Sequence, residues 1–147
     1  MSQFRFRAPV QHIPGFRELE IDAQPLLVKL QKAGIKVPVG LLDNRYYFTD
    51  LEGWGKVLSD LTFKSNLYAK EKWDCDNYAL KAMTVCAERY GLNTLGMVIG
   101  DIPTGRHAFN LFYYGEGFML HEPNAGFEYG GMFGLGENGY HADMLLM

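Results

Sequence analysis

Cys75 is the residue whose setting most clearly favours chemistry. It lies in the stretch WDCDNYA (residues 73–79), where Asp74 is a good N-cap for the helix that the following residues predict. The unpaired N–H groups and the dipole at a helix N-terminus stabilise a thiolate, which is the nucleophilic form of cysteine. The same N–H groups can hold the oxyanion that forms when a thiolate attacks a carbonyl. The sequence therefore predicts Cys75 as the nucleophile of an acyl-transfer reaction.

Two features favour a structural role for the same cysteine. Asp74 and Asp76 raise the pKa of the thiol between them unless their side chains point elsewhere or bind a cation. Small residues at helical spacing also form one apolar helix face, on which a buried cysteine is usually inert: Cys75, Ala79, Ala82 and Cys86. Both interpretations of Cys75 stay open, whereas Cys86, in the middle of this face, is predicted to belong to the core.

His107 and Glu122 are the candidates for the base and for the acid that orients it. His107 lies near the start of a predicted strand (residues 106–114), and Glu122 ends the next one (residues 118–122). The loop between them is a two-residue turn with glycine first, which pairs Phe109 with Glu122. His107 is then a diagonal neighbour of Glu122, about 7–8 Å away at the backbone, which long side chains can span. A carboxylate in that position fixes the imidazole tautomer and stabilises the imidazolium.

This arrangement depends on the register of the hairpin. A turn longer by one residue would move Glu122 to the opposite face, and Asn124, which pairs with His107 in the predicted register, is the alternative orienter. His121 points to the other face, and His12 and His141 lie in weakly defined segments. A structural role for a single strand histidine also stays open.

The elements that must position these residues change in character along the chain. Residues 1–21 are expected to be irregular. Helices are predicted at 25–32, from Thr49 as N-cap (with Glu52 completing a capping box) to about 61, and at 74–90.

Strands are predicted at 94–100, 106–114, 118–122, 126–129 and 140–146. The glycine- and aromatic-rich stretch at 126–139 is either a flap over a cleft or a turn-rich connection. Helices followed by a curled antiparallel sheet make an α+β domain, and we expect one domain over residues 1–147.

Composition excludes several classes. The net charge is −3 and the chain has only two cysteines. An acidic balance disfavours nucleic-acid binding, and no apolar run reaches the roughly 20 residues of a membrane span. Cys75 and Cys86 would stand about 16 Å apart on one helix, beyond the ~7 Å limit of a disulfide, so both are predicted to be free thiols. With no apolar leader at its start, the protein is expected to be cytoplasmic, without membrane or nucleic-acid partners.

Three stretches together resemble the papain-like and transglutaminase-like cysteine peptidases: WDCDNYA, GRHAFNLFY (residues 105–113) and HEPNAG (residues 121–126). They are most similar to a subgroup with an aspartate on each side of the nucleophile and a Glu-Pro dipeptide after the histidine strand. That subgroup includes the protease domain of fungal ricin-type chimeric lectins and related phage and bacterial proteins. The resemblance covers about residues 73–128.

The resemblance implies a papain-like core and a thiol-dependent hydrolase of peptide or isopeptide bonds. Cys75 would be the nucleophile, His107 the general base and Glu122 the orienting acid, acting on a peptide or protein substrate. No cofactor would be required. Calcium promotes activity in the fungal members, so Asp74 and Asp76 are the candidate metal ligands.

Alternative functions follow from the same motifs. Papain-type enzymes carry an oxyanion-hole glutamine several residues before the cysteine, whereas residues 66–72 here read NLYAKEK, with Asn66 as the available amide. This departure and the acidic neighbours of Cys75 favour an inactive structural or binding module of phage origin as the alternative. Amidase action on cell-wall peptides and transglutaminase-type acyl transfer are further expectations of the resemblance.

Overall fold

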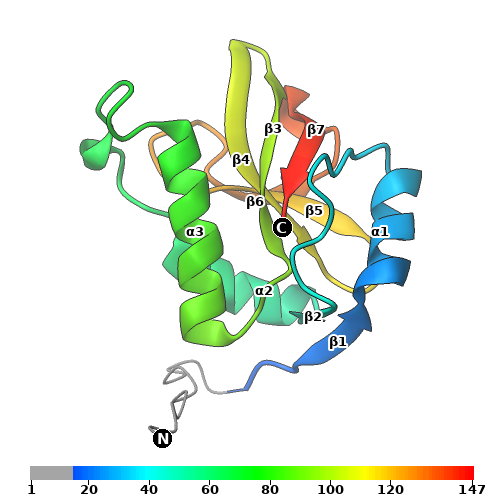
Figure 1. Cartoon of the computed structure of the whole chain (residues 1–147). Coiled ribbons are helices and arrows are strands. Elements are labelled where there is room, and N and C mark those ends of the chain that lie inside the picture. Colours follow the sequence, from blue (N-terminus) through cyan, green and yellow to red (C-terminus); the bar gives the residue numbers. More distant parts are fainter. Residues whose placement is uncertain (1–14) are drawn as a thin grey trace, which may run out of the picture.

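A five-stranded antiparallel sheet with three helices packed around it forms the part of the protein that the computed structural model describes, residues 15–147 (Figure 1). The helices are α1 (Ala23–Lys32), α2 (Leu51–Leu58) and α3 (Cys75–Tyr90). The sheet has the order β6-β5-β4-β3-β7, from β3 (Leu95–Ile102), β4 (Gly105–Tyr113), β5 (Phe118–Glu122), β6 (Gly131–Gly134) and β7 (His141–Leu146). The predicted α+β class, with the helices preceding the antiparallel sheet, is confirmed.

The hairpin between β4 and β5 has the predicted register. Asn110 pairs with His121 and Tyr113 with Phe118, so Phe109 stands opposite Glu122. The turn closes through the Tyr114 N–H, which donates to the Gly117 carbonyl at 3.1 Å, and Gly115 has a φ of 99°. That positive φ at the first turn residue is the conformation for which glycine is preferred. His107 and Glu122 therefore lie on one face of the sheet.

Helix α3 packs against β3 and β4 along a face of small residues. Ala79, Ala82 and Cys86 are fully buried there, so the prediction that Cys86 belongs to the core is confirmed. Asn110 of β4 fixes the helix, because its Nδ2 donates to the carbonyls of Ala79 at 3.0 Å and Gly96 at 3.1 Å. The N-terminal end of α3 thus lies near the start of β4, where His107 is located (Figure 1).

The first half of the chain contains a strand that the sequence did not predict. β1 (Leu19–Asp22) pairs with β2 (Arg45–Phe48) in a separate two-stranded sheet. The expectation that residues 1–21 are irregular is therefore wrong for 19–21, and its part at 1–14 lies outside the described residues, as does His12. β1 has only four residues and pairs with a strand distant in the sequence, so its local pattern is too short to be recognised.

The predicted strand at 126–129 is also wrong. The chain turns there, because the Phe127 N–H donates to Asn124 O at 3.1 Å and the Gly130 N–H donates to Phe127 O at 3.2 Å. The strand that pairs with β5 is β6, five residues later, with Leu120 opposite Phe133.

Helix α2 begins one residue later than predicted. Its N-cap is Asp50, whose Oδ1 accepts a hydrogen bond from the Gly53 N–H at 2.8 Å, so Thr49 is not the cap. The Thr49 side chain is buried instead, and its Oγ1 has no partner among the described residues. The α-helix ends at Leu58 and continues as one 3₁₀ turn, Ser59–Leu61.

Within residues 15–147 no helix combines the length and the apolar character needed to cross a bilayer.

Asp50→Ala is expected to lower the free energy of unfolding by about 1 kcal/mol, because the substitution removes the side-chain cap of α2. Thr49→Val is the matched comparison and is expected to leave stability unchanged or raise it, since it removes an unpartnered buried hydroxyl. Urea denaturation of both variants measures the two effects. A larger loss for Thr49→Val would show that Thr49 contributes to the cap.

Candidate active site

A tight turn before α3 places Cys75 as the first residue of the helix. Glu71 adopts a φ of 61°, and its N–H donates to Asp74 Oδ2 at 3.0 Å. Asn77 completes a capping box with Asp74, since its Oδ1 accepts from the Asp74 N–H at 3.1 Å. Asp74 is therefore the N-cap, as predicted, and Cys75 is held at the helix N-terminus with its side chain half-buried.

The surroundings of Cys75 lower the pKa of its thiol. The largest cause is its hydrogen bond with the His107 side chain, and the backbone of Ala108 acts in the same direction. Burial and the negative charge of Asp74 oppose the shift. The predicted effect of the acidic neighbour is thus present for Asp74, but the interaction with His107 outweighs it.

His107 and Glu122 form a buried pair. His107 Nε2 lies 2.5 Å from Glu122 Oε1, and the side chains are 5% and 1% exposed. Burial acts to lower the pKa of His107, but the interactions with Cys75 and Glu122 outweigh it and raise this pKa to about 9. Because Nε2 is engaged by Glu122, the ring nitrogen left for the thiol is Nδ1. The three predicted site residues therefore form a continuous thiol–imidazole–carboxylate series.

Aromatic rings surround the imidazole of His107. Phe127 stacks on it with a centroid distance of 4.6 Å, and Phe109 lies at 6.0 Å. The segment that contains Phe127 was expected to be either a flap or a turn-rich connection; at this residue it forms one wall of the histidine site.

Glu122 accepts hydrogen bonds on both of its oxygens. Oε1 receives the Tyr140 hydroxyl at 3.0 Å in addition to the imidazole, and Oε2 receives the Asn124 N–H at 3.1 Å. Tyr140 was not predicted as a site residue, because a tyrosine directly before the last strand carries no local signal for this contact.

The other candidates for the base or for its orienter do not take these positions. Asn124 Oδ1 accepts from the Gly126 N–H at 2.9 Å, so the amide of the alternative orienter serves its own turn, and the carboxylate of Glu122 occupies the place at His107. His121 is fully buried with Nε2 at 3.0 Å from Leu61 O, and His141 is exposed.

Asp74 and Asp76 interact with each other beside the thiol. The contact with Asp76 lowers the pKa of Asp74, and the contact with Asp74 raises the pKa of Asp76. With Cys75 Sγ their oxygens form a group within 4.8 Å. Calcium takes six to eight oxygen ligands, whereas this group offers two carboxylates and a soft thiol, so these residues by themselves do not make a calcium site.

Asn66, the amide expected near the oxyanion, lies exposed in the 3₁₀ turn Ser65–Leu67. Its assignment to an oxyanion hole stays a prediction.

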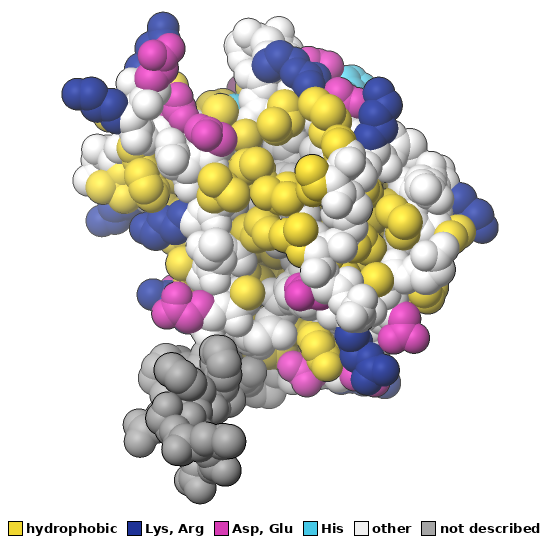
Figure 2. Space-filling model, viewed as in Figure 1, with side chains coloured by type: hydrophobic (Ala, Val, Ile, Leu, Met, Phe, Trp, Pro, Cys, Tyr) yellow, Lys and Arg dark blue, Asp and Glu magenta, His cyan; other side chains and the backbone are white. Residues whose placement is uncertain are grey.

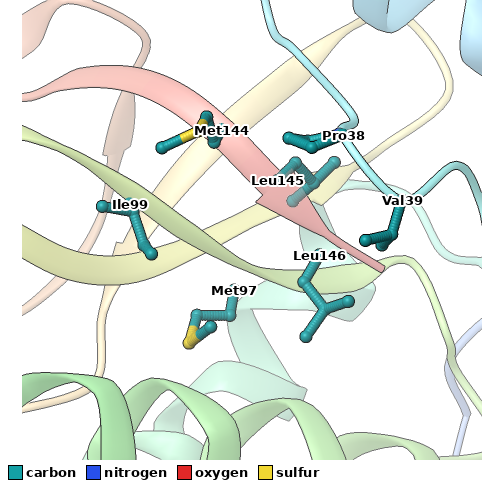
Figure 3. Close-up of a pocket in the computed structure, with 7 residues that line it drawn as sticks. All are labelled: Pro38, Val39, Met97, Ile99, Met144, Leu145 and Leu146. Atoms are coloured by element: carbon teal, nitrogen blue, oxygen red, sulfur yellow. The ribbon is translucent and has the colours of Figure 1, made fainter.

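An apolar hollow of about 170 Å³ lies on the sheet beside α3 (Figures 2 and 3). β3, β7 and the loop before β2 line it: Met97, Ile99, Met144, Leu145, Leu146, Pro38 and Val39. Ile99 pairs with Ala108, and Met97 pairs with Asn110, whose side chain reaches α3, so Met97 and Ile99 lie on the face that α3 covers in part. Ile99 therefore lies one strand spacing, about 5 Å, from Ala108, whose backbone interacts with the Cys75 thiol.

The fold is similar to that of proteins whose structures have been solved. No protein-family model matches the chain, and no curated protein matches it. Among solved structures the chain is similar to one described as a PSL1a-E64 complex, with a TM-score of 0.67 and 18% sequence identity over 88% of this chain. The match covers 50% of that protein, so the chain spans half of its length. At this identity the likeness shows a shared fold.

Proposed function

We propose that the protein is a papain-like, thiol-dependent hydrolase that cleaves peptide or isopeptide bonds, with Cys75, His107 and Glu122 as its catalytic residues. One juxtaposition carries the proposal: the Cys75 thiol lies beside an imidazole that lowers its pKa, and that imidazole is itself held by a buried carboxylate. A cysteine with a lowered pKa next to such a pair is an activated nucleophile.

The reaction would proceed through a thioester. The thiol proton passes to His107, and Cys75 Sγ forms a bond to the amide carbonyl carbon while the carbonyl π electrons move to oxygen. As the tetrahedral intermediate collapses, the C–N bond breaks and His107 gives its proton to the leaving amine. Water then attacks the thioester, His107 takes the proton of that water, and the S–C bond breaks to release the acid and the thiol. Backbone N–H groups at the start of α3 would hold the oxyanion, with Asn66 as the side-chain candidate.

The similar structure supports this assignment. Its description names a complex with E64, which is a cysteine protease inhibitor. A fold shared with a protein that binds such an inhibitor, together with a thiol and an imidazole in contact, favours a cysteine peptidase over an unrelated α+β protein.

The apolar hollow beside α3 supports a peptide substrate. Ile99 belongs to this apolar surface, is 38% exposed and pairs with Ala108 on the neighbouring strand. Burial of an apolar side chain there would offset part of the cost of holding a flexible chain next to the thiol. Amidase action on cell-wall peptides and acyl transfer to an amine would use the same first step and differ in substrate or acceptor.

An inactive module is the second candidate, because residues 66–72, directly before Cys75, contain no glutamine and because Asp74 opposes ionisation of the thiol. In that case the pair of His107 and Glu122 would serve only to hold the sheet together.

Cys75 is expected to react with iodoacetamide at pH 6 at least about 100-fold faster than Cys86, because only Cys75 is half-buried beside His107 while burial raises the pKa of Cys86. His107→Ala is expected to remove most of this advantage, whereas His141→Ala, at an exposed histidine, keeps it. Mass spectrometry of the two cysteine peptides measures both rates. Equal slow labelling in the wild type would support the inactive module.

The His107 ring is expected to titrate with a midpoint near pH 9, because the thiolate and Glu122 both stabilise the imidazolium. Removing either partner takes away interactions that oppose the effect of burial, so Cys75→Ala and Glu122→Gln should each lower the midpoint. The Cε1–H signal of His107 followed by NMR gives this value. A wild-type midpoint at or below the ordinary value for histidine would contradict the proposed ion pair.

Removal of calcium with EGTA is expected to leave the alkylation rate of Cys75 unchanged, because the interaction with His107 is the largest cause of the lowered pKa of the thiol. The same rate is measured with added calcium, and Asp76→Asn is the variant that removes one carboxylate of the Asp74–Asp76 pair. A several-fold calcium-dependent rise in rate, abolished in Asp76→Asn, would instead assign the pair a role in metal binding.

A further inference from the structure

We propose that Tyr140 is a positioning residue that acts through Glu122: its hydroxyl shares the oxygen that holds His107, and so limits how firmly the imidazolium keeps its proton. This inference rests on the proposed function, since it concerns the same pair of side chains.

The geometry is that of one acceptor with two donors. Glu122 Oε1 lies 2.5 Å from His107 Nε2 and 3.0 Å from the Tyr140 hydroxyl oxygen, while the Asn124 N–H occupies the other carboxylate oxygen. Tyr140 is 2% exposed, so water does not compete for these positions. Each donor draws on the same negative charge, and a carboxylate that also binds a hydroxyl is a weaker partner for an imidazolium.

The packing fixes the ring of Tyr140 independently of its hydroxyl. It meets Phe109 and Phe133 edge to face at centroid distances of 5.1 and 4.7 Å, and it meets His107 at 6.1 Å. The ring is therefore anchored in the core, and Tyr140→Phe removes the hydroxyl while keeping these contacts. Burial and the charge of Glu122 raise the pKa of Tyr140, so its hydroxyl remains a proton donor.

The titratable groups around the pair come from three elements. Cys75 faces His107 from α3, and Glu122 and its chain neighbour His121 belong to β5. Tyr140 precedes β7 and is the neutral donor among them. A change confined to its hydroxyl therefore reaches His107 through the shared carboxylate.

The chemical value of this arrangement lies in the second half of the proposed reaction. His107 must release its proton to the leaving amine, and an imidazolium bound to an unshared, desolvated carboxylate would release that proton less readily. Tyr140 would keep the pair strong enough to ionise the thiol and weak enough to act as an acid.

The test is the titration of the His107 Cε1–H signal by NMR in Tyr140→Phe. Its midpoint is expected to rise by about half to one pH unit above that of the wild type, because Glu122 then serves the imidazolium alone. Tyr113→Phe is the matched control, since it deletes another buried-ring hydroxyl, which donates to the Gly115 carbonyl at 2.9 Å and does not contact the pair. An unchanged or lowered midpoint in Tyr140→Phe would overturn the inference and leave Tyr140 as a core tyrosine.

A second variant covers the case in which Tyr140→Phe does not fold. A fluorinated tyrosine at position 140 keeps the ring and makes the hydroxyl a stronger donor, so the midpoint is expected to fall. A rise or no change would overturn the inference. The NMR midpoint does not require a reactive thiol: if Cys75 labels slowly but the midpoints move as stated, the proposed function fails alone, and if Cys75 labels rapidly but they do not, this inference fails alone.

Discussion

The buried carboxylate of Glu122 is the constraint on which the rest of the site depends. An ionised carboxylate taken out of water is costly unless hydrogen bonds and an opposite charge compensate it. Here the compensating groups come from separate parts of the chain: His107 from the neighbouring strand, Asn124 from the turn that follows, and Tyr140 from the residue before the last strand. The hydrogen bonds that compensate Glu122 therefore both hold these segments together and fix the position of the imidazole.

The pKa of the Cys75 thiol results from opposing influences. The helix places Cys75 beside the imidazole, while the neighbouring carboxylate of Asp74 and partial burial oppose its ionisation. The larger influence is the interaction with His107, which requires α3 to pack against β4, where Asn110 Nδ2 donates to the Ala79 carbonyl. The chemistry proposed for Cys75 thus depends on a polar contact more than one helical turn away from it.

Local sequence signals were sufficient for the parts of the site that local rules govern. The glycine-first turn specified the register that brings His107 and Glu122 to one face, and Asp74 specified where α3 begins. Tyr140 could not be found in this way, because its contact with Glu122 depends on how β7 returns beside β3, which no spacing in the sequence encodes.

The same distinction explains the errors in the fold. Thr49 fits the sequence pattern of a capping box as well as Asp50 fits that of a simple N-cap. Only the burial of the Thr49 side chain in the core shows that Asp50 is the cap. β6 lies in a stretch where glycines and aromatic residues alternate irregularly, so its partner β5, and not its own pattern, decides which four residues become a strand.

The placement of both cysteines on one helix has a consequence for the lifetime of the protein under oxidative stress. Cys75 is accessible at the first residue of α3 and Cys86 is sealed in the core three turns further on. A sulfenic acid formed on Cys75 therefore cannot condense with the other thiol of the folded chain, and its repair would have to come from an external reductant such as a small cellular thiol.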